Sequence, residues 1–355
     1  MKIVSIVGAR PQFVKLAPIA HACARHADIE HVIVHTGQHY DRTMSDVFFE
    51  MLDIPNADVD LGIGSGSHGA QTGAMLTAIE EVLERERPDW TLVYGDTNST
   101  LAGALAAVKM HLPVAHLEAG LRSFNRRMPE EHNRVLTDHA ADLLLAPTAV
   151  AMRHLADEGL AERSVLVGDV MTDVCLRTVA ALDGRPAPLP AGVDAAEPYL
   201  LATIHRADNT DEKPRLATIL DHLAALPIPV VLAAHPRLVA RAEGFGLELA
   251  RGAIRTTEPL PYPDMIAAVS RSAGVVTDSG GLQKEAYLLG VPCTTVRTET
   301  EWPETLVDGW NVLDPELADL PRIALRPVPA AARTHPYGTG DAAERALDAL
   351  LSAGR

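Results

Sequence analysis

Short apolar segments alternate with amphipathic helical segments along most of this 355-residue chain, and this alternation restricts the fold more than any other feature. In the first half, the segments typical of buried strands are 2–8, 31–37, 90–96, 113–120 and 142–147. The segments between them with helical spacing of apolar residues are 11–25, 70–87, 99–111 and 130–141. Strands that alternate with helices form right-handed crossover units, so the pattern predicts a parallel sheet.

A second alternating series follows a segment rich in Pro, Gly and Ala at 183–198, which we interpret as the region that links two domains. The sequence therefore predicts an α/β protein with two Rossmann-like, doubly wound parallel-sheet domains facing a cleft. In such sheets ligands bind beyond the carboxyl ends of the strands. We expect an N-terminal domain at 1–175, a C-terminal domain at 190–338, and a last helix within 339–355 that packs back on the N-terminal domain.

The net charge of −16 at pH 7 argues against a nucleic acid or an anionic membrane surface as a partner. The first residues lack the features of a signal peptide, and no apolar run reaches the roughly 18 residues of a membrane-spanning helix. The 3 cysteines and 15 histidines show no metal-ligand or redox spacing, so we expect a cytoplasmic protein without a tightly bound metal. Because the chain is negatively charged overall, a site for an anionic ligand would need cations and helix N-termini that make the local electrostatic potential positive.

Ionisable or anion-binding residues follow nearly every predicted strand of both series. Six strand ends carry Gly8–Arg10, Asp96, Glu118, His205–Arg206, His235 and Asp278–Gly281. Any one of these residues alone is more typical of a helix cap or a turn. Because the carboxyl ends of parallel strands meet at one edge of a sheet, the six together predict a binding site.

The first strand end leads directly into a helix and has the composition of an anion-binding turn. Gly8 and Ala9 are small, and Arg10 and Lys15 add positive charge to the start of the helix. The alternative is that Gly8 only closes the strand and that Lys15 is a solvated helix residue. The sequence leaves both interpretations open.

The segment 277–286, TDSGGLQKEA, offers the same arrangement in the second half of the chain. Ser279 is an expected N-cap, and Gly280 and Gly281 would expose backbone N–H groups to an anion. Glu285 lies one turn further on, where its carboxylate could accept hydrogen bonds from two ribose hydroxyls. An ordinary capped helix is the alternative, but the paired glycines favour a nucleotide or phosphate site.

Carboxylates gather around the strands of the first half. Asp96 and Glu118 end neighbouring strands, while Glu130 and Glu131 begin a helix behind Pro129. Carboxylates beside arginines differ in proton affinity, as general acid–base chemistry requires. The alternatives are an N-cap role for Asp96 and helix-dipole pairing for the two glutamates.

One run matches a nucleotide-binding motif by spacing alone. GSGSHG at 64–69 has the glycine spacing of the dinucleotide fingerprint, but VDLGI before it is too short and acidic for the required strand. We interpret the run as a loop that caps the following helix. The chain also lacks a P-loop and the H-E-x-x-H zinc motif.

Motifs in order along the whole chain resemble the UDP-N-acetylglucosamine 2-epimerase family. They are GARPQFVK (8–15), HTGQH (35–39), YGDTNSTLAGALAA (94–107), HLEAGLRS (116–123), MPEEHNR (128–134), TIHRADNTD (203–211), HPR (235–237) and TDSGGLQKEA (277–286). The resemblance implies a glycosyltransferase-B-type fold, no nicotinamide cofactor such as NAD, and commonly a homodimer. It also implies inversion of C2 in a UDP-HexNAc by anti elimination of UDP to a glycal and re-addition. The implied pair is UDP-GlcNAc and UDP-ManNAc, for surface polysaccharide precursors.

The resemblance assigns roles to the residues that match these motifs. It implies an acid–base and charge-stabilising set of Asp96, Glu118 and Glu130, with His205 beside the diphosphate. The residues implied for UDP are Arg10, Lys15, Arg206, Asp278, Ser279, Gly280, Gly281, Glu285 and Arg297. Some members bind a second UDP-GlcNAc as an activator, and the residues implied for that site are Gln38, Glu131, Arg134, Arg206 and His235. Asp41 stands where a longer polar side chain is expected, which argues against this activation.

A second departure bears on the substrate. Thr300-Glu301-Trp302 replaces the T-E-R of better-known members, and this variant resembles epimerases of UDP-2,3-diacetamido-2,3-dideoxyglucuronic acid. Arg126 and Arg127 either contact the additional carboxylate of that substrate or are solvated loop residues. Further alternatives are a hydrolysing relative that releases ManNAc and UDP, a glycosyltransferase of the same fold, and a sugar-nucleotide sensor. A sensor would be expected to lack one of the four residues implied in catalysis.

Overall fold

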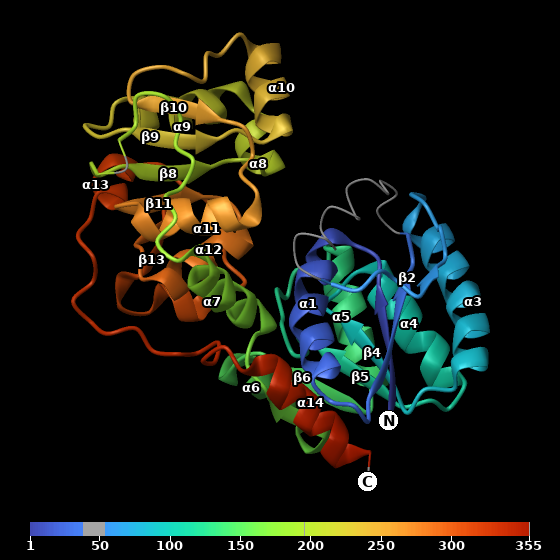
Figure 1. Cartoon of the computed structure of the whole chain (residues 1–355). Coiled ribbons are helices and arrows are strands. Elements are labelled where there is room, and N and C mark those ends of the chain that lie inside the picture. The colour runs from blue at the N-terminus through green and yellow to red at the C-terminus, as the bar shows by residue number, and fades with distance from the viewer. Residues whose placement is uncertain (38–53, 195, 355) are drawn as a thin grey trace. The chain divides into compact units, whose positions relative to one another are not determined.

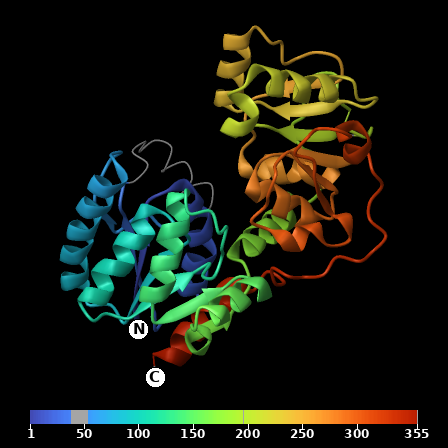
Figure 2. The same ribbon diagram turned by 180° about the vertical axis from the view of Figure 1, so that it is seen from behind.

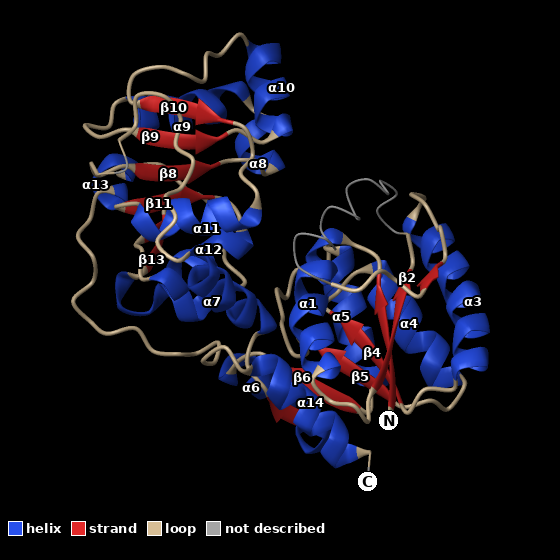
Figure 3. Ribbon diagram, viewed as in Figure 1, coloured by secondary structure: helices blue, strands red, loops and turns tan. Residues whose placement is uncertain are grey.

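The computed structural model describes residues 1–37, 54–194 and 196–354, and the chain forms two compact units. Unit 1 comprises Met1–Leu176 together with His335–Arg355, and unit 2 comprises Arg177–Thr334. Each unit has one parallel sheet with helices on both of its faces (Figure 1 and Figure 3). Each therefore has its own hydrophobic core.

In the described residues, the sheet of unit 1 has seven parallel strands in the order β3-β2-β1-β4-β5-β6-β7. The strands are β1 (Lys2–Val7), β2 (Glu30–His35), β3 (Val59–Asp60), β4 (Trp90–Tyr94), β5 (Val114–Leu117), β6 (Leu143–Ala146) and β7 (Ser164–Leu166). The strand order reverses between β1 and β4. Doubly wound sheets bind ligands at such a switch point, so the ends of β1, β4 and β5 mark the expected site.

Aliphatic side chains form one core on each face of this sheet. Ile3 and Val7 of β1 pack against α1 (Arg10–Ala24), α7 (Val170–Leu182) and α14 (Ala342–Ala353). Val4 and Ile6 belong to the opposite core, with α3 (His68–Glu86), α4 (Asn98–Lys109) and α6 (Ala149–Asp157). The alternation follows from the two-residue period of a strand that is buried on both faces. Helix α5 (Pro129–Ala140) packs beside α4, and a short 3₁₀ helix spans Ala161–Arg163.

The chain returns to unit 1 after unit 2 and ends there in α14 (Figure 2). Leu347 and Leu350 are buried in the same core as α1. Trp90 Nε1 donates a hydrogen bond of 3.1 Å to the Leu350 carbonyl. The carboxylate of Asp173 in α7 accepts the N–H of Ala343 at 2.8 Å, at the beginning of the helix. Helix α14 is therefore an integral part of unit 1.

The described part of unit 2 has a sheet of six parallel strands in the order β10-β9-β8-β11-β12-β13. The strands are β8 (Leu200–Thr203), β9 (Val230–Ala233), β10 (Ile254–Thr257), β11 (Gly274–Thr277), β12 (Cys293–Thr295) and β13 (Asn311–Leu313). The switch point lies between β8 and β11. Both units thus have the same strand order around their switch points.

Helices cover both faces of the second sheet as well. Residues of α9 (Lys213–Ala224), α10 (Pro236–Phe245) and α13 (Leu320–Ala324) belong to one core. Residues of α11 (Tyr262–Arg271) and α12 (Gly280–Leu289) belong to the other. Helix α8 (Ala207–Thr210) follows β8, and a 3₁₀ segment spans Pro303–Gly309.

The boundary between the units lies in α7, between Leu176 and Arg177, and thus before the segment 183–198 that the sequence marked as a linker. That segment belongs to unit 2. Ala187 is 7% exposed in a core of unit 2, and Leu189 and Val193 pack against it. Its Pro and Gly content therefore reflects irregular backbone that is packed on unit 2.

The prediction of two Rossmann-like parallel sheets is confirmed. The sequence pattern missed α7, α8, α13, β3 and β13. Four of these elements are five residues or shorter and lack a full period, whereas α7 begins two residues after a glycine turn at residue 168. In the described parts of the chain, no helix is both long and apolar enough to span a membrane.

Candidate active site

Two of the predicted carboxylates lie at the carboxyl ends of neighbouring strands in unit 1. Asp96 follows β4 after Gly95, and Glu118 follows β5 directly. Both turns use left-handed backbone, with a φ of 63° at Gly95 and 72° at Glu118. Glycine adopts this conformation readily, but a residue with a side chain is strained there. Glu118 is therefore held in an unfavourable conformation at the edge of the candidate site.

Glu118 forms an ion pair with Lys15 of α1. The side chains of Lys15 and Glu118 are only 13% and 9% exposed. Burial lowers the pKa of the Lys15 ammonium, but the charges of Glu118 and Asp96 raise it, and the resulting pKa lies above its usual value. Lys15 is thus a buried cation beside two carboxylates, and the interpretation of it as a solvated helix residue is wrong.

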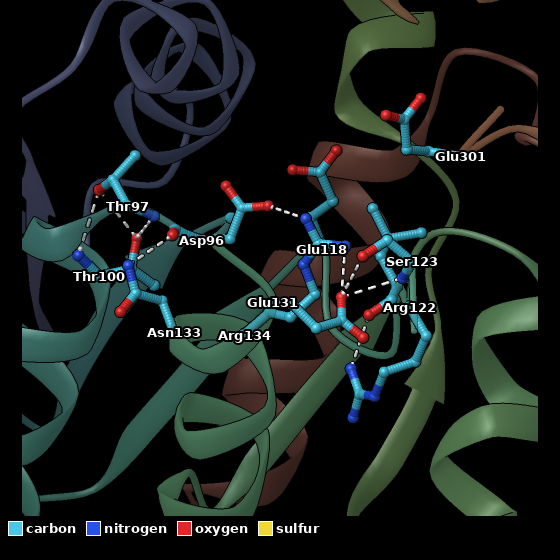
Figure 4. Close-up of polar contacts among 12 residues, drawn as sticks. Asp96, Thr97, Thr100, Glu118, Arg122, Ser123, Glu131, Asn133, Arg134 and Glu301 are labelled. Atoms are coloured by element: carbon cyan, nitrogen blue, oxygen red, sulfur yellow. Dashed lines mark hydrogen bonds and ion pairs between the residues drawn. The ribbon is translucent and has the colours of Figure 1, made fainter. Parts of the chain in front are cut away.

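The carboxylate of Asp96 contacts Arg134 of α5 (Figure 4). The Asp96 carbonyl also accepts a hydrogen bond of 2.9 Å from Asn133 Nδ2. The alternative that Asp96 caps α4 is wrong, because Thr97 is the N-cap and its Oγ1 accepts the N–H of Thr100 at 3.3 Å. The side chain of Asp96 is therefore directed to a cation and not to the helix backbone.

Glu131 is buried and ties the loop after β5 to α5 (Figure 4). Its carboxylate accepts the N–H groups of Ser123 and Phe124, both at 2.9 Å, and pairs with Arg134 at 3.2 Å. Burial raises the pKa of Glu131, but hydrogen bonds from Ser123 and Phe124 and the charge of Arg134 lower it below its usual range. Glu131 therefore stays ionised and fixes both the loop and Arg134.

Other residues expected at this site are not part of the cluster. Helix α5 begins at Pro129, as predicted, and Glu130 in its first turn is exposed. Within the described residues, the Glu130 carboxylate has no hydrogen bond or ion pair. Arg10 begins α1, but its side chain lies outside the described part of the structure, as do Gln38 and Asp41.

The turn after β1 does not offer its backbone N–H groups to a ligand. Those of Gly8 and Ala9 donate to Gln12 Oε1 at 2.8 and 3.0 Å, and Gln12 Nε2 donates to the Tyr94 carbonyl at 2.9 Å. The buried Gln12 side chain therefore occupies the backbone N–H groups of the turn that was predicted to let an anion approach the helix. A glutamine two positions into a helix is a capping signal that was visible in the sequence.

A buried polar network, which the sequence reasoning missed, lies next to these strand ends. His116 of β5 contacts Asp138 Oδ1 through Nδ1 and the Gly95 carbonyl through Nε2. Asp138 Oδ2 also accepts hydrogen bonds from the Gly120 N–H and from Arg122. Burial raises the pKa of Asp138, but His116 and Arg122 lower it below its usual range. The run HLEAGLR carries three of these residues, so part of the signal was present in the motif.

Asp278 organises the strand ends of unit 2. It is fully buried after β11, and its carboxylate accepts the N–H groups of His205 and Arg206 at 3.0 and 2.9 Å. Asn209 Nδ2 donates to it at 3.0 Å. These bonds join the end of β8 to the end of β11 at the switch point of the sheet. Asp278 thus fixes the turn after β8 from which the side chains of His205 and Arg206 project.

His205 projects from that turn with its side chain 36% exposed, and its ring centroid lies 5.3 Å from that of His235. Burial lowers the pKa of His205, Asp278 raises it, and His235 and Arg206 lower it, so that it lies below 6.5. The imidazole is therefore neutral near pH 7 and can donate one hydrogen bond. His235 is the N-cap of α10, since its Nδ1 accepts the N–H of Arg237 at 3.1 Å.

The beginning of α12 has the arrangement that the sequence predicted. Ser279 is the N-cap, and its Oγ accepts the N–H of Leu282 at 3.5 Å. Gly280 and Gly281 are the first helical residues, and N–H groups at these positions have no partner inside a helix. Glu285 lies in the next turn and is 8% exposed. This end of α12 is suited to an anion.

Two arginines and a carboxylate lie against the same helix end. Arg297 donates two hydrogen bonds of 2.8 Å to Glu301, and Arg206 lies 3.6 Å from that carboxylate. A Cβ atom on Gly280 would lie 3.4 Å from Glu301 Oε2. Arg206, Arg215 and Arg297 are among the residues that line a cavity of about 270 Å³. The lining of this cavity also includes Asp208 and Glu299, so the arginines of unit 2 lie among carboxylates, and Arg206 and Arg297 share Glu301 beside the beginning of α12.

Proton transfer and anion binding are the chemistry that these groups offer. Unit 1 contributes carboxylates held by cations, and unit 2 contributes a neutral imidazole and an anion-binding helix end. Within residues 1–37, 54–194 and 196–354, no three His, Cys, Asp or Glu side chains gather as a metal site would require.

Known proteins resemble this chain over most of its length. A family model described as UDP-N-acetylglucosamine 2-epimerase matches residues 21–351. The chain is also 49% identical over 319 residues to the UDP-2,3-diacetamido-2,3-dideoxy-D-glucuronate 2-epimerase of Pseudomonas aeruginosa, covering 88% of each protein. The chain belongs to the UDP-N-acetylglucosamine 2-epimerase family.

Further relatives of this epimerase have solved structures. This chain is 42% identical over 323 residues to the UDP-N-acetylglucosamine 2-epimerase of Methanocaldococcus jannaschii, covering 88% of each protein. The crystal structure of UDP-GlcNAc 2-epimerase from that organism, in complex with UDP-GlcNAc and UDP, matches with a TM-score of 0.84 and 39% identity over 99% of this chain and 100% of that one. The Neisseria meningitidis enzyme bound to UDP-GlcNAc matches with a TM-score of 0.85 and 28% identity over 99% and 100%. The protein is thus an isomerase with the two-sheet, glycosyltransferase-B-like fold of this family.

Proposed function

We propose that this epimerase interconverts UDP-GlcNAc and UDP-ManNAc. The observation that carries the proposal is the arrangement after β4 and β5, where Asp96 and Glu118 each contact a cation. The Methanocaldococcus jannaschii relative, whose structure holds UDP-GlcNAc and UDP, supports it. A cytoplasmic homodimer that supplies precursors of surface polysaccharides is part of the same proposal.

The reaction must remove a proton from a carbon that has no carbonyl group beside it. UDP leaves C1 with the electron pair of the C1–O bond, and the C2 proton passes to a carboxylate on the opposite face. A C1–C2 double bond forms and gives 2-acetamidoglucal. Re-addition of UDP to C1 and delivery of a proton to the other face of C2 complete the inversion. Departure of UDP builds positive charge on the sugar ring, which nearby carboxylates stabilise.

Asp96, Glu118 and Glu130 are the carboxylates proposed for these steps. Lys15 and Arg134 orient Glu118 and Asp96, so their charges are held in place before the sugar ring becomes cationic. Glu130 is exposed and unpaired in the described residues, which leaves its carboxylate able to take up a proton.

UDP is proposed to bind chiefly to unit 2. The N–H groups at the start of α12 and the helix dipole favour a phosphate there. Arg206 and Arg297 would leave Glu301 and contact the diphosphate instead. His205, as a neutral imidazole, would donate a hydrogen bond to the diphosphate. The residues proposed for UDP are Arg10, Lys15, Arg206, Asp278, Ser279, Gly280, Gly281, Glu285 and Arg297.

A second, activating nucleotide is proposed to contact Gln38, Glu131, Arg134, Arg206 and His235. Glu131 and Arg134 form an ion pair with each other, and Arg134 also contacts Asp96. A ligand that changed the position of Arg134 would therefore alter the partner of a catalytic carboxylate.

A second candidate substrate is UDP-2,3-diacetamido-2,3-dideoxyglucuronate. The observation that favours it is the 49% identity to the Pseudomonas aeruginosa enzyme of that name. Arg126 and Arg127 are exposed in the loop after β5, where cations could meet the additional carboxylate. The chemistry at C1 and C2 would be the same for both substrates.

One experiment separates these functions. The protein is incubated in D₂O with each UDP-sugar in turn, and the products are followed by NMR. We expect UDP-GlcNAc to yield UDP-ManNAc with deuterium at C2. Turnover of the diacetamido-uronate alone would replace the first candidate by the second, and release of free ManNAc and UDP would identify a hydrolase.

Glu130 is tested separately. The variant Glu130→Gln should fold and bind UDP as the wild type does, because its side chain is exposed and unpaired in the described residues. Turnover should fall by at least about a hundredfold if it transfers the proton. Glu162→Gln, in the 3₁₀ helix at Ala161–Arg163, is a matched control that should keep full activity. Unchanged activity of Glu130→Gln would remove this residue from the mechanism.

A further inference from the structure

The protons of one buried histidine in unit 1 can be counted from its hydrogen bonds. His116 is 0% exposed, with Asp138 Oδ1 2.6 Å from Nδ1 and the Gly95 carbonyl 2.7 Å from Nε2. A carbonyl oxygen only accepts hydrogen bonds, and so does an ionised carboxylate. Arg122 donates to Asp138 Oδ2 at 2.7 Å and favours the ionised form. Both ring nitrogens of His116 therefore face oxygen acceptors, an arrangement in which both hydrogen bonds can form only when each nitrogen carries a proton.

The charges of this network alternate in sign. Arg122 lies between Asp138 and Glu158, to which it donates two further hydrogen bonds of 2.7 and 2.8 Å. The cations His116 and Arg122 thus match two carboxylates. A buried charge is unfavourable unless it is paired and hydrogen-bonded, and each buried charge here meets both conditions.

The network is attached to the backbone where the two catalytic carboxylates project. The Gly95 carbonyl, held by His116, directly precedes the first of these residues. Asp138 accepts the N–H of Gly120 at 3.1 Å, two residues after the second. Gly95 and Gly120 both have positive φ, at 63° and 81°, which glycine adopts as readily as many other conformations, so the hydrogen bonds of the network select these turns among those open to the two glycines.

We propose that His116 is a positioning residue for epimerisation: as an imidazolium anchored on Asp138, it fixes the turns from which Asp96 and Glu118 project. The inference rests on the proposed function of those two carboxylates. His116 acts through the Gly95 carbonyl and does not meet the substrate. A neutral ring would lose one of its two hydrogen bonds and release one side of this connection.

The protonation state is measured by nitrogen-15 NMR of the histidine rings in the whole protein at about pH 8, where a free imidazole is neutral. We expect one ring with protons on both nitrogens in the wild type. That signal should disappear in His116→Gln and become that of a neutral ring in Asp138→Asn. A wild-type His116 ring with a single proton would overturn the proposal, even if neither variant folds.

Kinetics test the positioning role. Asp138→Asn should lower kcat by roughly a hundredfold, the order expected when a catalytic group is misplaced by about 1 Å, and should leave the KM for the UDP-sugar nearly unchanged. Asp138→Glu should recover part of the loss.

Asp173→Asn is the matched control. Asp173 is a buried carboxylate of unit 1 that accepts the N–H groups of Ala342 and Ala343 at 3.1 and 2.8 Å and serves α14. This variant should lose stability but keep its kcat. Equal losses of kcat in Asp138→Asn and Asp173→Asn would overturn the positioning role. A wild-type protein without turnover would overturn the proposed function and with it that role, while NMR would still decide the protonation state.

Discussion

Glu118 combines two features that each cost free energy at the scale of a single residue. A φ of 72° is unfavourable for a residue with a side chain, by about 1–3 kcal/mol. Its carboxylate is also withdrawn from water, with the side chain 9% exposed. Lys15 offsets the buried charge, and the strand ends of β4 and β5 hold the backbone. Strain of this kind is retained where the surrounding structure determines the conformation, as at catalytic sites.

Replacing Lys15 by methionine is expected to lower the free energy of unfolding by roughly 3 kcal/mol, because Glu118 would keep a buried charge without its counter-ion. Urea denaturation followed by circular dichroism measures the loss. The double variant Lys15→Met, Glu118→Gln should regain much of this stability, since neither charge remains. A single variant as stable as the wild type would mean that water screens the pair in solution.

Individual site residues differ in how far the sequence could predict them. Ser279, Gly280 and Gly281 were predictable because a cap and its free N–H groups depend only on neighbouring residues. The partners of Gln12 and His116 were not, since Tyr94 lies 82 positions from Gln12 and Asp138 lies 22 positions from His116. Such contacts depend on how helices settle against the sheet, which a local pattern does not contain.

The turn after β4 is the element that places Asp96, and it leaves little space at Gly95. Its φ is 63°, and an added Cβ would lie 3.1 Å from Lys15 Nζ and 3.3 Å from Glu118 Oε2. Alanine there should cost about 1–2 kcal/mol of stability for the backbone conformation and should also displace the ion pair. We therefore expect Gly95→Ala to reduce both stability and turnover.

Gly62→Ala is the matched control for this turn. Gly62 has a φ of 61°, but an added Cβ would meet no atom within 4 Å. Its loss of stability should match only the backbone part of the loss in Gly95→Ala, while turnover stays at the wild-type level. Similar turnover of the two variants would show that the space over Lys15 and Glu118 is not needed for catalysis.

Three strands of unit 1 are joined by a buried polar chain that makes stability depend on pH. Ser5 Oγ lies 2.8 Å from His31 Nε2 and 2.7 Å from the Tyr94 hydroxyl. Burial lowers the pKa of His31 from 6.5 to about 4, although Asp58 opposes the shift. The unfolded chain therefore binds a proton near pH 6 that the folded protein does not bind.

The contribution of His31 is fully present above about pH 6.5 and is lost as the pH falls towards its folded pKa of about 4. The loss amounts to as much as about 3 kcal/mol over this range. His31→Gln should flatten that part of the profile, as measured by urea denaturation at several pH values. Parallel profiles for the variant and the wild type would contradict this assignment.

At the scale of elements, the strands were predictable because both faces of each sheet are buried, which makes them nearly continuous apolar runs. The helices that line the sheets were predictable from their apolar spacing. The segment 183–198 shows the limit of this reasoning: its composition suggested a linker, but Ala187 packs in a core of unit 2. Composition records irregular backbone and does not say on which unit that backbone packs.

On the scale of the whole molecule, unit 1 depends on a helix that follows unit 2 in the sequence. The side chain of Leu347 in α14 is 1% exposed in the core of unit 1. Leu347→Asp should therefore destabilise unit 1 by about 3 kcal/mol or more, because it buries an unpaired charge. Unit 2 has its own cores and should be affected much less.

The three tryptophans report the units separately. Trp90 belongs to unit 1, and Trp302 and Trp310 belong to unit 2. Two reporter variants are made in the Leu347→Asp background, one that keeps only Trp90 and one that keeps only Trp302 and Trp310. The fluorescence of Trp90 should change at a lower urea concentration than the fluorescence of the other two tryptophans. Glu344→Gln, on the same helix but exposed at its surface, is the control and should shift neither transition much. Equal shifts for both reporters would show that the units unfold together.

The discontinuity of unit 1 also sets an order of events on the ribosome. Residues 177–334 form one contiguous stretch, whereas the first 176 residues lack a wall of their core until α14 has been made. At about 5–20 residues per second, that interval lasts roughly 9 to 35 s. The nascent chain therefore presents an open apolar face on its first sheet while the later unit is already able to close. That face is covered only once α14 packs on it, so the finished protein no longer exposes it.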